Sequence, residues 1–104
     1  MAKWGGVTGC LSVARNALAH GRRYFPHFLG AGVGLAASAE LLAAVGGDGW
    51  LEVDVNDNPL RSMFFDGREP VADGLWRCGD GPGLGIDGLP GDLAPFQTLY
   101  ADIH

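Results

Sequence analysis

Two stretches of the chain carry apolar residues at helical spacing. From Val7 onward such residues recur three and four positions apart, which lines one face of a helix. Gly21 suits the left-handed position just past a helix end, so we expect the first helix over residues 8–20. A second helix is predicted over residues 35–45, because the same spacing returns there and stops at a pair of glycines.

Each predicted helix is followed by a short stretch with the pattern of a strand. Residues 22–26 form an aromatic run that Pro26 closes just before His27. Residues 50–55 alternate strictly, with Trp50, Glu52 and Asp54 on one side and Leu51, Val53 and Val55 on the other. Helix, strand, helix and strand joined by short connections indicate an α/β fold with a parallel sheet.

The remainder of the chain shows no sustained periodicity. Prolines and glycines interrupt it from Asn56 onward, and only residues 75–78 and 96–100 resemble short strands or turns. We expect this tail to wrap over another part of the protein. A complete eight-stranded α/β barrel needs about 250 residues, so a chain of 104 holds less than half of one.

Composition narrows the classes of partner. The formal net charge of −5 disfavours nucleic acid and anionic membranes as partners. Cys10 and Cys78 are far apart in the sequence, which argues against a disulfide framework or a zinc site. The start of the chain has no leader pattern, and glycines and Glu40 interrupt the least polar stretch, residues 28–47. We therefore expect a soluble, cytoplasmic protein.

Two titratable residues stand where an α/β fold places its chemistry. His27 ends the first predicted strand, and ligands bind at the carboxyl ends of strands in such folds. The alternative for His27 is a surface or structural histidine. Glu52 is expected to project toward a barrel interior, where a carboxylate is costly unless it is paired or protonated, so we favour a functional role for it. Asp54 shares its face and could equally be the solvated end of the strand.

Three further residues are candidates for binding an anion. Gly30 and Gly32 belong to a glycine-rich loop before the second helix, where backbone N–H groups can receive a carboxylate or phosphate. Close packing of the helix on the strand explains the same glycines, and the G-x-G-x-x-G motif of dinucleotide sites is absent. Lys3 could bind a substrate anion, or could simply be solvated.

Five motifs together resemble one known family. They are Lys-Trp-Gly-Gly-Val-Thr-Gly at residues 3–9, Pro26-His27, Ala-Ser-Ala at residues 37–39, Leu51-Glu52, and Gly-Pro-Gly-Leu-Gly-Ile at residues 81–86. In this order and spacing they resemble the C-terminal part of the mandelate racemase and muconate lactonizing enzyme group of the enolase superfamily. The resemblance covers nearly the whole chain.

The resemblance implies a partial (β/α) TIM-type barrel, roughly strands six to eight with helices six and seven, and an irregular capping tail. On this reading residues 1–58 supply the barrel units and residues 59–104 return to the capping region. The implied elements are the end of strand six at residues 2–4, helix six at 8–20, strand seven at 23–26, helix seven at 35–45 and strand eight at 51–53.

The resemblance also implies a reaction and roles for individual residues. Members of the group remove a proton α to a carboxylate and hold the resulting enediolate on Mg²⁺. By position, His27 resembles the general base or acid of strand seven. Glu52 resembles the strand-eight acid that donates a hydrogen bond to the enediolate oxygen. Lys3, Gly30 and Gly32 are the candidate substrate-binding residues, and the implied substrate is a hydroxy acid or an acid sugar, handled by a racemase or a dehydratase.

Several parts of the family's site have no counterpart in this sequence. They are the metal-binding carboxylates of strands three to five, the lysine pair of strand two, and the aspartate that precedes the position of Lys3 by three residues. We therefore expect the chain alone to bind no Mg²⁺ specifically and to be inactive. We expect it to pair with itself or with a complementary N-terminal fragment. The alternative is a noncatalytic remnant that serves as an interaction module.

Overall fold

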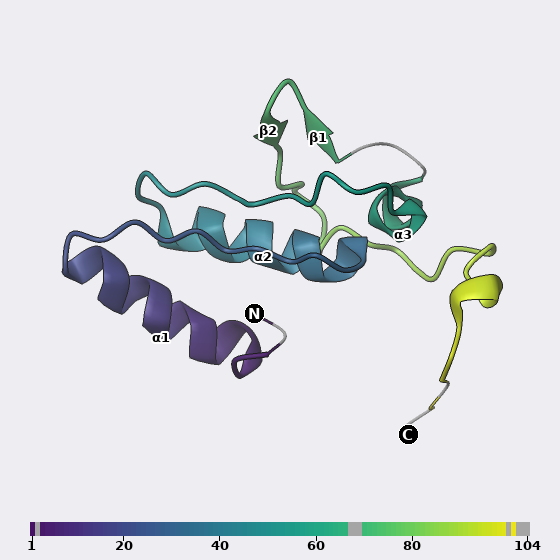
Figure 1. Ribbon diagram of the computed structural model, residues 1–104, viewed down its shortest axis with the longest axis horizontal. Coiled ribbons are helices and arrows are strands. Elements are labelled where there is room, and N and C mark those ends of the chain that lie inside the picture. Colours follow the sequence, from purple (N-terminus) through teal and green to yellow (C-terminus); the bar gives the residue numbers. More distant parts are fainter. Residues whose placement is uncertain (2, 67–69, 100, 102–104) are drawn as a thin grey trace.

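The computed structural model describes residues 1, 3–66, 70–99 and 101. In chain order the elements are α1 (Gly6–Ala19), α2 (Gly32–Val45), α3 (Pro59–Ser62), the 3-10 helix η1 (Met63–Phe65), the strands β1 (Val71–Ala72) and β2 (Leu75–Trp76), and the 3-10 helix η2 (Ala94–Phe96). Helix α1 contacts α2, and α3 and η1 contact α2 as well (Figure 1).

Helices α1 and α2 confirm the two predicted helices, although both begin two or three residues earlier than expected. Gly5 takes a left-handed conformation with φ of 74°, which turns the chain directly into α1. The helix therefore starts before Thr8, which lies within its first turn. At the C-terminal end of the second helix, α2, Gly46 has φ of 67° and ψ of −152°. This conformation ends the helix where the sequence predicted.

The two predicted strands are extended but do not form a regular ladder. A single parallel bridge joins His27 and Glu52, in which the Glu52 N–H donates to the Pro26 carbonyl at 3.0 Å. Pro26 has no N–H of its own and so takes a donor away from the pairing. In Figure 1 the two segments run in the same direction across α2, so the parallel arrangement is as predicted, whereas neither segment forms a continuous strand.

Contacts at a constant sequence offset fix the register of this parallel pair. Arg23 Nε lies 2.7 Å from Asp48 Oδ2, and these residues are 25 apart in sequence, as are His27 and Glu52. Gly49 approaches the backbone of Tyr24 so closely that a Cβ at Gly49 would collide with the Tyr24 carbonyl oxygen, again at an offset of 25. Helix α2 thus connects the two parallel segments as the crossover helix of a β-α-β unit does, although here the segments are extended chain rather than regular strands.

The structure does not confirm a partial barrel. The regular sheet among the described residues is the antiparallel hairpin of β1 and β2, with Val71 opposite Trp76 and Ala72 opposite Leu75. Residues 3–5, predicted at or just after the end of strand six, lie in a turn in which the Trp4 N–H donates to the Met1 carbonyl at 3.1 Å, and residue 2 is outside the described residues. The strand-six prediction is therefore wrong for residues 3 and 4.

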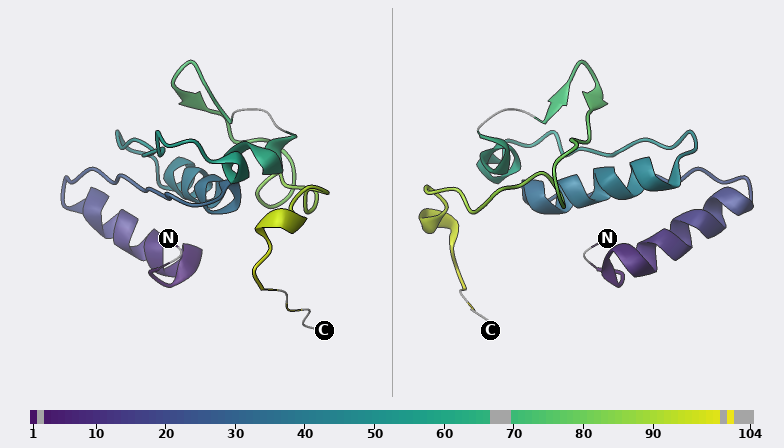
Figure 2. Two further views of the ribbon diagram at one scale, coloured as in Figure 1. Left: turned by 45° about the vertical axis from the view of Figure 1, so that its right-hand side comes forward. Right: turned by 180° about the vertical axis from the view of Figure 1, so that it is seen from behind.

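The C-terminal part is mainly irregular, as predicted. Strand β2 covers two residues of the predicted fragment 75–78, and the Trp76 ring packs edge-on against Phe65 with a centroid distance of 5.5 Å. The predicted fragment 96–100 instead begins with the last residue of η2, and Tyr100 lies outside the described residues. Figure 2 shows η2 standing apart from α1 and α2 in both views.

The core is small and centred on α2. Its fully buried side chains include Leu35 and Ser38, whose hydroxyl donates to the Gly34 carbonyl at 2.9 Å, while α1 contributes Cys10 and Ala14. The Cα radius of gyration is 14.6 Å, against about 13 Å for a compact domain of 100 residues. The chain is therefore more open than a typical domain of its length. None of the helices described is long and apolar enough to span a bilayer.

Candidate functional site

His27 and Glu52 form the centre of the candidate site. Their bridge places the two side chains side by side, and His27 Nδ1 lies 3.7 Å from Glu52 Oε2. This separation is an ion-pair contact when the imidazole is protonated and is too long for a good hydrogen bond. The sequence placed the pair at the ends of neighbouring parallel strands, and the structure brings them together.

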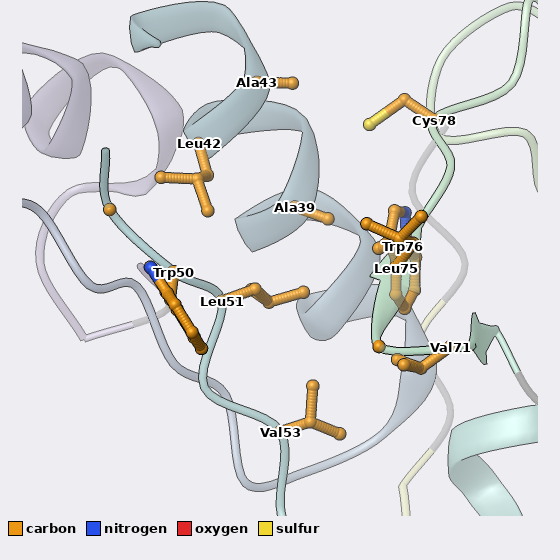
Figure 3. Close-up of a pocket in the computed structure, with 12 residues that line it drawn as sticks. Ala39, Leu42, Ala43, Trp50, Leu51, Val53, Val71, Leu75, Trp76 and Cys78 are labelled. Carbon is orange, nitrogen blue, oxygen red and sulfur yellow. The ribbon is translucent and has the colours of Figure 1, made fainter. Parts of the chain in front are cut away.

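The pair lies on the face of the extended segments that is turned away from α2. Leu51 and Val53, on either side of Glu52, line a cavity with Ala39 and Leu42 of α2 (Figure 3). Because side chains alternate along an extended backbone, Glu52 points to the opposite face. In a β/α barrel the face opposite the helices is the interior, so the orientation of Glu52 matches the one predicted.

The expected burial of Glu52 is wrong for this chain. The His27 and Glu52 side chains are 60% and 61% exposed. An exposed pair of this kind is well solvated, and its mutual attraction is weak. The geometry of the pair therefore comes from the backbone register rather than from the charges.

A cavity of about 800 Å³ gathers three of the predicted site residues, Lys3, His27 and Gly30. The remaining wall is mainly apolar and comes from the turn before α1, which supplies Met1 and Trp4, from α1 and from residues 24–29. Lys3 adds a positively charged side chain, so the cavity combines a cation, an imidazole and an apolar surface. Such a combination suits a small organic anion.

Gly32 is not part of this cavity. It is buried at the start of α2, where a Cβ would collide with the Arg61 carbonyl oxygen and approach the Phe65 ring at 2.8 Å. Its role in the structure is close packing of α2 against α3 and η1, whereas the alternative offered by the sequence was close packing of the helix on the strand.

Two residues beside the site, Asn58 and Arg61, were not among the candidates predicted from the sequence. The Asn58 side chain accepts a hydrogen bond from the Leu60 N–H at 3.1 Å and donates one to the Gly30 carbonyl at 3.3 Å. Arg61 Nη1 donates to the carbonyls of Asp54 at 2.8 Å and Asn56 at 3.1 Å. Asn before Pro is a recognisable helix start, so the cap at Asn58 was detectable, but its contact with a residue 28 positions away was not.

Two groups away from the pair have raised pKa values. Partial burial raises the pKa of the Cys78 thiol, although the residue is exposed overall, and the hydrogen bond and negative charge of Glu40 raise it further. The thiol therefore stays protonated at neutral pH. Figure 3 shows the Cys78 sulfur directed towards α2 in the cavity that Leu51 and Val53 line, which has a volume of about 530 Å³. The pKa of Tyr24 is raised by burial and then by Cys10.

The described residues do not fit a divalent metal ion. No three His, Cys, Asp or Glu side chains among them lie close enough together to hold one. A magnesium site needs several oxygen ligands in near-octahedral geometry, which His27 and Glu52 alone do not supply.

Comparison with known proteins places the chain in a family. Residues 1–90 match the family described as enolase C-terminal domain-like. The chain is also 36% identical over 93 residues to D-galactarolactone cycloisomerase from Agrobacterium fabrum (strain C58 / ATCC 33970), an alignment that covers 80% of this chain and 24% of that protein. No solved structure gives a significant match. The chain spans about a quarter of the curated relative, and it belongs to the enolase C-terminal domain-like family, as its motifs predicted.

Proposed function

We propose that this chain supplies the proton-transfer pair of an enolase-superfamily enzyme that removes a proton α to a carboxylate. The observation that carries the proposal is the parallel bridge at His27 and Glu52, which sets an imidazole and a carboxyl 3.7 Å apart on the face away from α2. Membership of the enolase C-terminal domain-like family supports the same assignment, because the motif resemblance gives His27 and Glu52 the roles of the strand-seven and strand-eight residues.

In the proposed step the pair holds one proton more than a neutral imidazole and an ionised carboxylate would. When that proton resides on Glu52, the imidazole of His27 is neutral and its lone pair can accept the substrate's α-proton. Nδ1 is the nitrogen nearer Glu52, which leaves Nε2 for the substrate. The electron pair of the broken C–H bond moves onto the carboxylate, and the protonated Glu52 donates a hydrogen bond to the oxygen where charge develops. The imidazolium then returns the proton to carbon or to a leaving group.

The cavity beside the pair supports a small carboxylate as the substrate. Lys3 and His27 line the same space, so a carboxylate bound by Lys3 would bring its α-carbon towards the imidazole. The curated relative is named for a lactone of a sugar acid. We therefore propose a sugar acid, or the lactone of one, as the substrate class. The described residues supply no ligand set for Mg²⁺, so this chain contributes the proton-transfer pair rather than the metal site.

A chimera tests this proposal. The stretch of the Agrobacterium enzyme that aligns with this chain would be replaced by the matching part of this chain, and the product would be incubated in D₂O with D-galactarolactone and with D-galactarate. We expect solvent deuterium to enter the α position of a substrate, as detected by NMR. A chimera that folds but exchanges no α-hydrogen under conditions in which the parent Agrobacterium enzyme does so would contradict the proposal.

For the chain alone, we predict no specific Mg²⁺ binding and no α-proton exchange. The reason is the missing ligand set among the described residues. Titration calorimetry with MgCl₂ is expected to show only weak, non-stoichiometric heats, with CaCl₂ as the control for nonspecific binding to this acidic chain. One-to-one binding of Mg²⁺ would refute the prediction.

A second proposed function, an interaction module, is favoured by one observation. Large apolar side chains are unusually exposed, with Trp4 and Trp50 at 73% and Val55 at 96%. Exposed apolar surface of this kind marks sites of association. Sedimentation of the chain alone and α-proton exchange by the chimera together distinguish the two proposals. A stable self-associated chain together with an inactive chimera would support the interaction module.

A further inference from the structure

The Asn58 side chain links the two loops that follow the extended segments. Gly30, whose carbonyl accepts from Asn58 Nδ2 at 3.3 Å, comes three residues after His27. Asn58 itself comes six residues after Glu52. One amide group therefore joins the loop that follows the imidazole to the loop that follows the carboxyl.

Arg61 stiffens the loop that carries Asn58. Its Nη1 donates to the carbonyls of Asp54 and Asn56 at 2.8 and 3.1 Å, while Asp54 Oδ1 accepts from the N–H of Asn56 at 3.0 Å and from its side-chain amide at 2.7 Å. These bonds close the turn directly behind Glu52. The Glu52 loop and α3 thus behave as one unit.

Helix α3 is in turn fixed against the start of α2. Gly32 lets the Arg61 carbonyl approach its backbone, and Phe65 covers the same point. The loop of residues 28–31 is therefore held between α2 on one side and the Asn58 amide on the other. At the other end of the pair, Arg23 and Asp48 join the segments before they reach His27 and Glu52.

We propose that Asn58 is a positioning residue that sets the separation of His27 and Glu52. Its Nδ2 holds the Gly30 carbonyl, so the loops after the two side chains stay at a fixed distance. The side-chain hydrogen bonds of Asn58 go to the backbone of Gly30 and Leu60, so Asn58 acts on the positions of His27 and Glu52 through the backbone. The catalytic meaning of this role rests on the proposed function, whereas the geometric role stands on its own.

The two ends of the Asn58 side chain allow its two roles to be separated. Oδ1 caps α3 by accepting from the Leu60 N–H, and Nδ2 makes the link to Gly30. Asn58→Asp keeps the acceptor, and aspartate caps helices as well as asparagine does, but it has no N–H to donate. Asn58→Ala removes both.

Disulfide trapping measures the separation directly. The 104-residue chain would carry His27→Cys and Glu52→Cys, with Cys10→Ala and Cys78→Ser to remove the native thiols. Directly bridged positions suit a disulfide, which forms only within a narrow range of Cα separations. The rate of 27–52 bond formation under a fixed glutathione ratio is then compared among Asn58, Asn58→Asp and Asn58→Ala, with thermal melts of the reduced forms.

We expect rapid trapping with Asn58 and trapping about fivefold slower with Asn58→Asp, the effect of losing one hydrogen bond. Asn58→Ala should be as slow as Asn58→Asp and should also melt lower, because it loses the cap. Equal rates for Asn58 and Asn58→Asp would overturn the positioning role while leaving the pair intact. Failure of the Asn58 chain to trap at all would overturn both the positioning role and the convergence on which the proposed function depends.

Discussion

Replacing His27 with asparagine is expected to lower the rate of α-proton exchange in the chimera by about 10²–10⁴-fold, the usual contribution of a positioned acid or base. Asparagine is polar and of similar size, but its side chain does not accept a proton in the physiological range. His27 is 60% exposed and its ring meets Glu52 at 3.7 Å, so little packing is lost. Exchange is measured by NMR in D₂O, and folding by circular dichroism.

Three further variants test the roles assigned to His27 and Glu52. Glu52→Gln keeps a hydrogen-bond donor at the position where we assign one, so it should lose less rate than Glu52→Ala. His20→Asn is the matched control: His20 is exposed at the end of α1, where its Nδ1 lies 2.9 Å from the Asn16 carbonyl. If His20→Asn reduced exchange as much as His27→Asn, or if His27→Asn only lowered the melting temperature, the assigned role of His27 would be wrong.

The helices could be predicted because their signals are local. Apolar spacing and terminal glycines gave α1 and α2 to within three residues. The two predicted strand segments are extended and parallel but are not regular strands, because regular pairing depends on neighbours that a local pattern does not describe. Pro26 removes one donor, and each segment has one partner in this structure, so a single bridge remains at His27 and Glu52.

The candidate site was predictable in its orientation and not in its burial. Parallel topology put His27 and Glu52 at the same end of neighbouring segments, and alternation put Glu52 on the face away from Leu51. Burial depends on what covers that face, which a short segment does not encode. Likewise the contact of Asn58 with Gly30 joins residues 28 apart, and only the folded backbone reveals it.

Among the substitutions considered, Gly49→Ala is expected to lower the stability of the fold most. The Gly49 backbone meets that of Tyr24 in the same register as the His27–Glu52 bridge, with room for hydrogen alone: a Cβ would collide with the Tyr24 carbonyl oxygen and lie 3.3 Å from Leu42 Cδ1. Gly49→Ala must push the two extended segments apart. We expect a loss of about 1–3 kcal/mol, as for other overpacked sites, and a lower melting temperature by circular dichroism.

Gly88→Ala supplies the control for this substitution. A Cβ at Gly88 would meet nothing within 4 Å, so the same chemical change should be neutral or slightly stabilising there through the unfolded chain. Because Gly49 and Tyr24 share the offset of 25 with Glu52 and His27, separating the segments at Gly49 should also slow 27–52 disulfide trapping, whereas Gly88→Ala should not. Equal melting and trapping for the two variants would mean that the close approach at Gly49 does not hold the register, and that the position of the pair is set elsewhere.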